Sequence, residues 1–310
     1  MAIETRNTFM QRDVFLGVVF ALLAAIGFSA KAILVKLAYL ASSVDAVTLL
    51  ALRMVFSVPF FIAVAVWLRR HEAAPLNTHD RLLVLGLGLI GYYLSSFLDF
   101  LGLQYISAGL ERLILFLYPT LTVIFTAVLY RRAIGRKVIA AMALSYAGIA
   151  LVFWHDVGIH PGDVVLMGAG LVFASTVSYA LYLVGAGHAI TRIGALRFTA
   201  YAMMVASAAC VLQFVLMRPL SALDLPVSVY QYSIAMALFS TVLPVFLLSF
   251  AIRRIGSGSA SLIGTVGPVS TIYMGYLFLN EPVSALQIAG SALVLCGVLL
   301  ISLNSKKEAA

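Results

Sequence analysis

Long apolar stretches alternate with short polar intervals along the whole chain. A helix that crosses a bilayer needs about 20 mostly apolar residues. Suitable stretches lie near 14–37, 45–67, 82–103, 108–130, 138–154, 164–185, 197–217, 230–252, 258–279 and 284–303. The intervals between them are too short for a soluble domain. The pattern therefore predicts an all-α integral membrane protein with ten transmembrane helices.

The basic residues collect on one side of these predicted helices. If the N-terminus is cytoplasmic, the inner side carries Arg6, Arg12, Arg69, Arg70, Arg81, Arg131, Arg132, Arg136, Lys137, Arg192, Arg197, Arg253, Arg254, Lys306 and Lys307. The outer side carries only Arg218. Lys and Arg are enriched in the cytoplasmic loops of membrane proteins. We therefore expect a multi-pass protein of the inner (plasma) membrane with both termini in the cytoplasm.

Composition agrees with a lipid environment. Hydrophobic residues make up 63% of the 310 residues and charged residues only 10%, against about 25% in a typical soluble domain. The net charge of +8 does not indicate a nucleic-acid partner, because the basic residues flank apolar stretches and form no stripe. Cys210 and Cys296 both lie within apolar stretches, which argues against a disulfide framework. The apolar segment from Val14 is too long for a cleaved signal peptide.

The chain repeats itself at half its length. A shift of 149 residues overlays 106–153 on the region that begins at Ile255, with Pro119 matching Pro268 and Gly148 matching Gly297. We divide the chain into a first repeat, 13–154, and a second repeat, 163–303. Each repeat holds five helices, an odd number, so the second must enter the membrane from the opposite side. Inverted repeats of this kind are widespread among secondary transporters, with the substrate site near mid-membrane between them.

The second repeat contains the most specific motifs. Residues 258–271 read Gly-Ser-Ala-Ser-Leu-Ile-Gly-Thr-Val-Gly-Pro-Val-Ser-Thr, and Leu-Asn-Glu-Pro follows at 279–282. With these motifs the chain resembles the EamA-type members of the drug/metabolite transporter superfamily. The first repeat departs from the pattern, since Tyr130-Arg131-Arg132-Ala133 stands where a Glu would fall.

Two features point to a narrower resemblance: the missing Glu in the first repeat, and the run Leu-Tyr-Pro-Thr-Leu-Thr at 117–122. Both are similar to the YddG-type bacterial exporters of aromatic and other neutral amino acids. The resemblance implies efflux from the cytoplasm through a central cavity that opens alternately to each side. Related subfamilies export quite different metabolites or drugs, and a channel or a lipid flippase on the same fold is a further alternative.

Polar side chains inside the predicted helices could line the transport path. Such residues are costly in lipid and usually face the bundle interior or a cavity. The set comprises Tyr92, Tyr93, Ser96, Asp99, Glu111, Tyr118, Thr122, Ser175, Tyr179, Tyr182, Ser261 and Thr265. Tyr92, Ser96 and Asp99 recur at i, i+4 and i+7, so they share one helix face. The alternative is ordinary: Ser and Thr often bond their own backbone, and Tyr often lies at the membrane interface.

Embedded charges occur only in the first repeat. Lys31, Arg53 and Arg112 lie in its outer half with Asp99 and Glu111. One hypothesis is a charged vestibule in which these groups pair and contact the ammonium or carboxylate of a substrate. The alternative is a structural ion-pair cluster that reaches toward the interface. Any proton coupling would run through one of the two carboxylates, and facilitated diffusion is equally compatible.

The prolines Pro119, Pro244 and Pro268 each lie inside a predicted helix. A proline removes one backbone hydrogen bond and usually kinks the helix. Matched kinks at Pro119 and Pro268 could serve as hinges for alternating access, although static bends would look the same.

The sequence shows no sign of an enzyme. The loop residues His155, Asp156, His160 and Asp163 match no standard metal-site spacing, and a Gly-rich nucleotide cradle is absent. We therefore expect no metal and no cofactor. The expected partners are a small-molecule substrate and the bilayer, and a single chain suffices to enclose the cavity.

Overall fold

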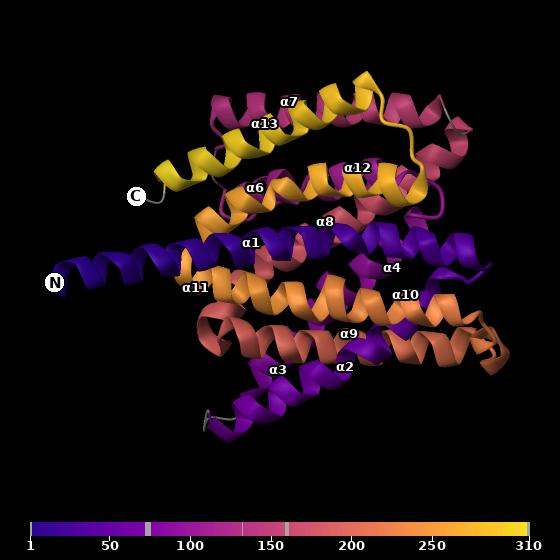
Figure 1. The fold of residues 1–310 in the computed structure, drawn as a ribbon, viewed down its shortest axis with the longest axis horizontal. Helices are drawn as coiled ribbons and strands as arrows, with labels where there is room; N and C mark the ends of the chain where they lie inside the picture. The colour runs from indigo at the N-terminus through magenta and orange to yellow at the C-terminus, as the bar shows by residue number, and fades with distance from the viewer. Residues whose placement is uncertain (1, 72–75, 132, 159–160, 309–310) are drawn as a thin grey trace.

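The computed structural model describes residues 2–71, 76–131, 133–158 and 161–308, and these form helices without any strand. The helices lie side by side with roughly parallel axes, and both chain termini lie at the same end of the bundle (Figure 1). We call this end the termini face and the other end the opposite face. The prediction of an all-α fold is confirmed.

The first half of the chain contains α1 (Ala2–Ala41), α2 (Ala46–His71), α3 (Thr78–Gly88), the π-helix η1 (Leu89–Leu94), α4 (Ser95–Gly102), α5 (Ala108–Leu115), α6 (Tyr118–Leu129) and α7 (Arg136–Val157). The second half contains α8 (Gly162–Ile193), α9 (Ala195–Met217), the 3-10 helix η2 (Leu220–Leu223), α10 (Val227–Ala237), the π-helix η3 (Leu238–Val242), α11 (Leu243–Gly264), α12 (Val266–Leu279) and α13 (Ala285–Glu308). In α11 the helix is interrupted at Gly256, whose φ of 77° turns the chain between two membrane crossings.

Among the described residues, nine segments are long and apolar enough to cross a membrane. They are Asp13–Ala41, Ala46–Arg70, Thr78–Gly102, Ala108–Leu129, Arg136–Val157, Gly162–Gly187, Ala195–Met217, Val227–Gly256 and Leu262–Leu279. The shorter apolar helix Ala285–Ile301 follows them. These segments coincide, within a few residues, with the ten predicted from the apolar stretches.

Packing between the halves is reciprocal. The first helix of each half packs against the third and fourth segments of the other half: α1 contacts α11 and α12, while α8 contacts α4 and α6. The second helices, α2 and α9, pack together, as do the fifth, α7 and α13. In Figure 1, α1 runs from left to right and α8 from right to left. Matching helices of the two halves therefore run in opposite directions.

The helices of the two halves are interrupted at positions that lie 149 residues apart, the shift that relates the two repeats in the sequence. The π-helices η1 and η3 begin at Leu89 and Leu238, which a shift of 149 residues overlays. The fourth segment of each half is broken at Phe116 and at Thr265, which the same shift overlays. Each break lies just after the carbonyl that the following proline cannot bond, because Pro119 and Pro268 lack the N–H that would reach four residues back. Proline chemistry thus places both breaks.

The fifth helices approach each other closely through glycine. A Cβ added to Gly148 of α7 would overlap the carbonyl oxygen of Gly290 in α13, and one added to Gly290 would overlap that of Gly148. Small residues permit this backbone approach between membrane helices. The α7–α13 pair lies along one edge of the bundle (Figure 1).

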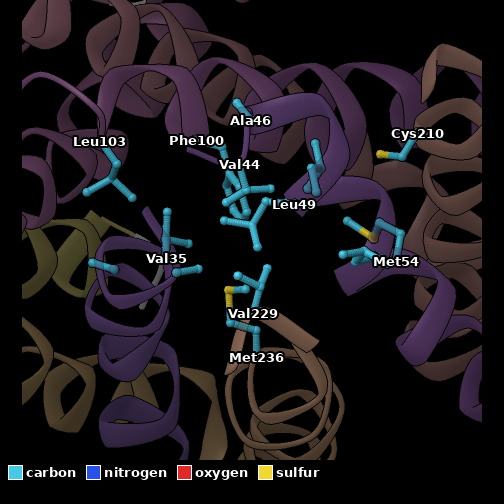
Figure 2. Packing of buried hydrophobic residues seen from close by; sticks show 14 of the residues in the cluster. Val35, Val44, Ala46, Leu49, Met54, Phe100, Leu103, Cys210, Val229 and Met236 are labelled. Atoms are coloured by element: carbon cyan, nitrogen blue, oxygen red, sulfur yellow. The ribbon is translucent and has the colours of Figure 1, made fainter. Parts of the chain in front are cut away.

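The largest buried apolar cluster among the described residues is drawn in part in Figure 2. It joins the end of α1, the start of α2 and the start of α10, with Val35, Leu49 and Val229 fully buried. Phe100 of α4 is also fully buried in it. This packing closes the bundle on the opposite face.

Candidate substrate cavity

A cavity of about 390 Å³ lies at the centre of the bundle between the two halves. Its lining residues are Ala21, Ala24, Ala25, Phe28, Lys31, Arg53, Gly91, Tyr92, Ser95, Ser96, Asp99, Arg112, Leu115, Phe116, Tyr118, Ser175, Thr176, Tyr179, Ser240, Leu248, Ile252, Ala260 and Gly264. Small-molecule sites typically occupy roughly 300–1,000 Å³. The cavity is therefore large enough for a metabolite.

Many of the polar residues predicted for the transport path line this cavity. They are Lys31, Arg53, Tyr92, Ser96, Asp99, Arg112, Tyr118, Ser175 and Tyr179. The face shared by Tyr92, Ser96 and Asp99 does point into it, although the π-helix η1 lies within that stretch.

The other predicted residues lie behind the lining. Tyr93 stacks on Phe97, and the fully buried Glu111 contacts Lys31. The hydroxyls of Thr122 and Thr265 donate to carbonyls of their own helical turns. These two threonines follow the ordinary behaviour of Ser and Thr in membrane helices.

Tyr182 supports the lining from behind, because its hydroxyl donates to that of Tyr92 at 3.0 Å. The side chain of Ser261, also predicted for the path, lies outside the described residues.

The two π-helices and the two breaks in the fourth segments all reach the cavity. Gly91 and Tyr92 belong to η1 and Ser240 to η3, while Leu115 and Gly264 directly precede the two breaks. Within a membrane, irregular backbone is tolerated where it is buried in protein or lines a water-filled cavity. Single-turn π-helices frequently mark functional sites. The backbone therefore singles out the same place as the polar side chains.

The predicted prolines lie beside these segments. Pro119 and Pro268 follow the two breaks, and Pro244 begins the α-helical turn after η3. A Cβ on Gly27 of α1 would lie 2.6 Å from Pro244 Cγ and 2.6 Å from the carbonyl oxygen of Phe239. Glycine at this position thus lets α1 pack directly onto the irregular segment.

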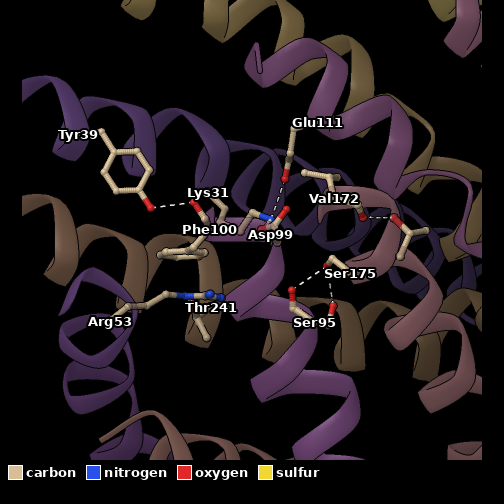
Figure 3. Close-up of polar contacts among 11 residues, drawn as sticks. Lys31, Tyr39, Arg53, Ser95, Asp99, Phe100, Glu111, Val172, Ser175 and Thr241 are labelled. Atoms are coloured by element: carbon tan, nitrogen blue, oxygen red, sulfur yellow. Dashed lines mark hydrogen bonds and ion pairs between the residues drawn. The ribbon is translucent and has the colours of Figure 1, made fainter. Parts of the chain in front are cut away.

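Lys31 holds the acidic side of the cavity together (Figure 3). Its Nζ lies 2.5 Å from Asp99 Oδ2 and 2.9 Å from Glu111 Oε1. Both carboxylates are nearly inaccessible to solvent, with side chains 3% and 0% exposed. One cation from α1 therefore joins α4 to α5 beside the cavity.

The arginines are arranged differently. Arg53 Nε donates to Thr241 Oγ1 at 2.9 Å, and its guanidinium lies 5.5 Å from the centre of the Phe100 ring. Arg112 reaches toward the start of α12, where a Cβ on Gly267 would lie 2.7 Å from Arg112 Nη2. Among the described residues, neither arginine forms an ion pair with a carboxylate. Of the charge pairings considered from sequence, only those of Lys31 are formed.

One wall of the cavity is built from tyrosines. Tyr118 meets Tyr179 edge to face with ring centres 5.6 Å apart, and Tyr179 stacks on Tyr182 at 5.5 Å. Tyr182 in turn meets Tyr92 at 5.1 Å. Ser95 and Ser175, whose hydroxyls lie 3.0 Å apart, join η1–α4 to α8 beside this wall.

The remaining lining was not anticipated. Ala21, Ala24, Ala25 and Phe28 form one face of α1 at helical spacing. A search for polar residues overlooks such a stripe, although its spacing and small side chains are visible in the sequence. Ser240 could have been found from Gly91 through the 149-residue shift.

The cavity extends toward the termini face. Its α1 lining stops at Lys31, while Val35 and Ala38 beyond it are fully buried. On α11 it reaches Ile252, four residues before the turn at Gly256, or about 6 Å along the helix. The charged groups thus lie at the end of the cavity farther from the termini face, and its apolar lining lies toward the termini face.

Several contacts seal the opposite face. The Tyr39 hydroxyl donates to the Phe100 carbonyl at 2.8 Å. Glu281, from the Glu-Pro motif, pairs with Lys36 at 3.3 Å and accepts the Ala108 backbone N–H at 2.9 Å. The motif therefore ties the end of α12 to the start of α5.

Asp45 adds an ion pair on this face, with its Oδ2 lying 3.1 Å from Arg218 Nε. It also accepts the backbone N–H groups of Val47 and Thr48 at the start of α2. Burial raises the pKa of Asp45, but hydrogen bonds from Thr48 and Arg218 outweigh this effect and lower it below its ordinary value.

Two of the residues considered for a metal site, His155 and Asp156, lie at the end of α7 and not in a loop, and they make other contacts. Asp156 accepts hydrogen bonds from the backbone N–H and hydroxyl of Ser107, at 2.9 and 3.0 Å. His155 Nδ1 lies 3.5 Å from the same carboxylate, and His160 lies outside the described residues. Within the part of the chain that the structure describes, no group of three or more His, Cys, Asp or Glu side chains could hold a metal ion.

Comparison with known families gives a match in each half. The model of the EamA-like transporter family matches residues 15–154 and again residues 166–303. The chain belongs to the EamA-like transporter family. Membership makes it a membrane transporter and not an enzyme.

Relatives extend the family match over most of the chain. The uncharacterized transporter YcbK of Bacillus subtilis (strain 168) is 31% identical over 287 residues, covering 90% of each chain. The uncharacterized transporter YyaM of the same organism is 28% identical over 70% of this chain and 71% of its own length. The uncharacterized transporter sll1319 of Synechocystis sp. (strain ATCC 27184 / PCC 6803 / Kazusa) is 24% identical over 93% of each chain.

A solved crystal structure shares the fold of this family member. The two superpose with a TM-score of 0.63 over 95% of this chain and 99% of the other, at 17% sequence identity. At this identity the likeness concerns the fold alone.

Proposed function

We propose that the protein exports small neutral or aromatic amino acids, or closely related metabolites, by alternating access through the central cavity. The observation that carries this proposal is the cavity itself, which lies between the two halves and is lined by the irregular segments of both. Inverted-repeat transporters bind their substrates at this kind of interface.

The lining suits a molecule with one polar and one apolar end. Charged and hydroxyl groups, including Lys31 and Arg53, surround the part of the cavity farther from the termini face, and alanines of α1 surround the part toward that face. Tyr92, Tyr118 and Tyr179 offer aromatic contacts to an apolar side chain. This combination supports an amino acid with an apolar or aromatic side chain.

The conformational change would use the broken segments. In the structure the apolar cluster around Phe100 closes the opposite face, and the cavity extends toward the termini face. We propose that bending at the breaks before Pro119 and Pro268, together with η3 beside Pro244, opens the opposite face and closes the termini face. Hinges of this kind are a few residues that absorb a change in φ and ψ.

The distribution of charge supports a particular membrane and orientation. The excess of Lys and Arg on the termini face supports a cytoplasmic location for both termini in the inner (plasma) membrane. The cavity in this structure would then be directed toward the cytoplasm, where an exporter collects its substrate.

Counterflow in proteoliposomes tests the proposal. Vesicles loaded with unlabelled L-phenylalanine, L-methionine or L-threonine should accumulate the same labelled amino acid from outside, with saturable kinetics. A carrier gives this exchange, whereas a channel gives non-saturating flux without counterflow. Labelled phospholipid should not change leaflet at a rate above that of empty vesicles. The proposal fails if no amino acid in a full panel exchanges.

A further inference from the structure

Two arginines at the cavity lack an acidic partner among the described residues. Arg53 is 7% exposed, and its Nη1 is buried without a hydrogen-bond partner in the described part of the chain. Arg112 also lines the cavity, and its Nε is likewise buried and unpartnered there. A buried hydrogen-bond donor without an acceptor costs about 1–3 kcal/mol, and more when it belongs to a charged group. Such a pair of groups is expected to meet an anion.

The nearby carboxylates form no ion pair with either arginine, and one oxygen of each is itself buried without a hydrogen-bond partner among the described residues. Asp99 and Glu111 both point to Lys31, within 2.5 and 2.9 Å (Figure 3). Three cations and two carboxylates leave the cluster with a formal charge of +1. A ligand with one negative charge would neutralise it, whereas a phosphate dianion would leave an excess negative charge in a low-dielectric site.

The shape of the cavity limits what carries that charge. The volume of about 390 Å³ admits a small molecule. Away from the arginines the lining is apolar, with Ala21, Ala25 and Ile252 toward the termini face. An acid group at the arginines would therefore direct an apolar substituent toward that face and along the tyrosine wall.

We infer that Arg53 and Arg112 bind the carboxylate of the transported molecule, so that the substrate class is a small monocarboxylate with an apolar group. The planar guanidinium carries five N–H donors in a fork that matches a carboxylate. The contact does not require an amino group, so acids that lack one should also bind. The inference deepens the proposed function and rests on it for transport, but the binding step can be measured separately.

Thermal unfolding of the purified protein in detergent tests the ligand side, because a ligand that binds only the folded state raises the unfolding temperature. The probes are L-phenylalanine, L-leucine and 3-phenylpropionate, each compared with its amide. The amides keep the shape of the acids and lose the negative charge. At least one acid should stabilise the protein at millimolar concentration, and its amide should do so at least tenfold less effectively. Equal effects of an acid and its amide, or no effect of any acid, would overturn the inference.

Variants test the residues. Arg53→Gln and Arg112→Gln should each weaken acid binding about tenfold or more, as expected for the loss of a charge-assisted hydrogen bond. The matched control is Arg136→Gln, because Arg136 is exposed at the start of α7. Binding that is unchanged in both folded glutamine variants would overturn the assignment. If either variant fails to fold, the comparison of acids with amides on the unmodified protein still decides.

The counterflow assay and the binding assay together distinguish failure of the proposed transport function from failure of the proposed arginine site. Acid-selective binding without counterflow would remove the proposed function and leave the arginine site in place. Counterflow that accepts amides as well as acids would support the transporter and overturn the carboxylate site.

Discussion

The third and fourth segments of the two halves share a backbone design and differ in their chemistry. The 149-residue shift that overlays η1 on η3 also places Asp99 over Leu248 and Glu111 over Ala260. Leu248 and Ala260 line the cavity, as Asp99 does. The backbone irregularities that shape the cavity are thus present twice, while the embedded charges are present once. Shape and recognition can therefore be altered independently.

The largest loss of stability should come from replacing Lys31. In Lys31→Met, two carboxylates that are almost fully buried lose their shared cation. Breaking a buried pair in this way typically costs about 3–5 kcal/mol, so the unfolding temperature in detergent should fall steeply.

Replacing the two carboxylates with neutral amides should restore the stability lost in Lys31→Met. Combining Lys31→Met with Asp99→Asn and Glu111→Gln removes the unpaired charges, and most of the lost stability should return. The substitution Leu248→Ala, at the position of the second half that matches Asp99, should cost less than Lys31→Met. A Lys31→Met protein as stable as its parent would contradict the account of the ion-pair cluster.

A smaller effect is expected at a pair of matching backbone positions. A Cβ on Gly91 of η1 would overlap the Tyr182 ring, so Gly91→Ala should cost about 1–3 kcal/mol through overpacking and reduce transport. At Ser240 of η3 the side chain already exists, and Ser240→Ala loses only the hydroxyl bond to the Met236 carbonyl, about 1 kcal/mol at most. Thermal unfolding and counterflow on both variants check this difference. Equal losses would show that the two π-helices are not packed differently.

The prolines test the shared backbone. Pro119→Ala and Pro268→Ala each restore an N–H that can bond the carbonyl of Leu115 or Gly264. One recovered hydrogen bond stabilises the unbroken helix by about 1 kcal/mol, enough to slow the conformational change about fivefold. Transport rates in proteoliposomes should fall similarly in both.

Pro59→Ala is the matched control, because Pro59 lies inside α2 and is exposed on the bundle surface. Its transport rate should remain that of the parent. Unchanged rates in both Pro119→Ala and Pro268→Ala would leave the breaks as static bends.

The smallest effect concerns the ion pair on the opposite face. Arg218→Gln removes the partner of Asp45 and should cost less than about 1 kcal/mol, as for other partly exposed pairs. Since the pKa of Asp45 is lowered in the folded state, its contribution is present above the ordinary Asp pKa of about 4 and is lost as the pH falls through the lower folded value. Unfolding measured between neutral and acidic pH should show the difference between parent and variant shrinking with acidity. A constant difference would contradict the pairing.

The sequence predicted the fold better than the site. Membrane crossings follow from length and hydropathy, so 108–130 predicted the crossing at Ala108–Leu129. The face containing Ser96 and Asp99 followed from helical spacing. The partner of Asp99 could not be derived, because Lys31, Arg53 and Arg112 were all compatible with it and only packing selects Lys31. The π-helices were not predicted, since a reading at 3.6 residues per turn assumes an unbroken helix.

The central claim is that the cavity opens to each face in turn, and a single cysteine tests it directly. In a chain carrying Cys210→Ala and Cys296→Ala, the substitution Ser96→Cys places one thiol in the cavity. Its reaction with a membrane-impermeant thiol reagent is measured in right-side-out and in inverted vesicles. The account predicts labelling from both faces, slowed by a transported substrate in each case. Labelling from one face only, or from neither, would contradict it.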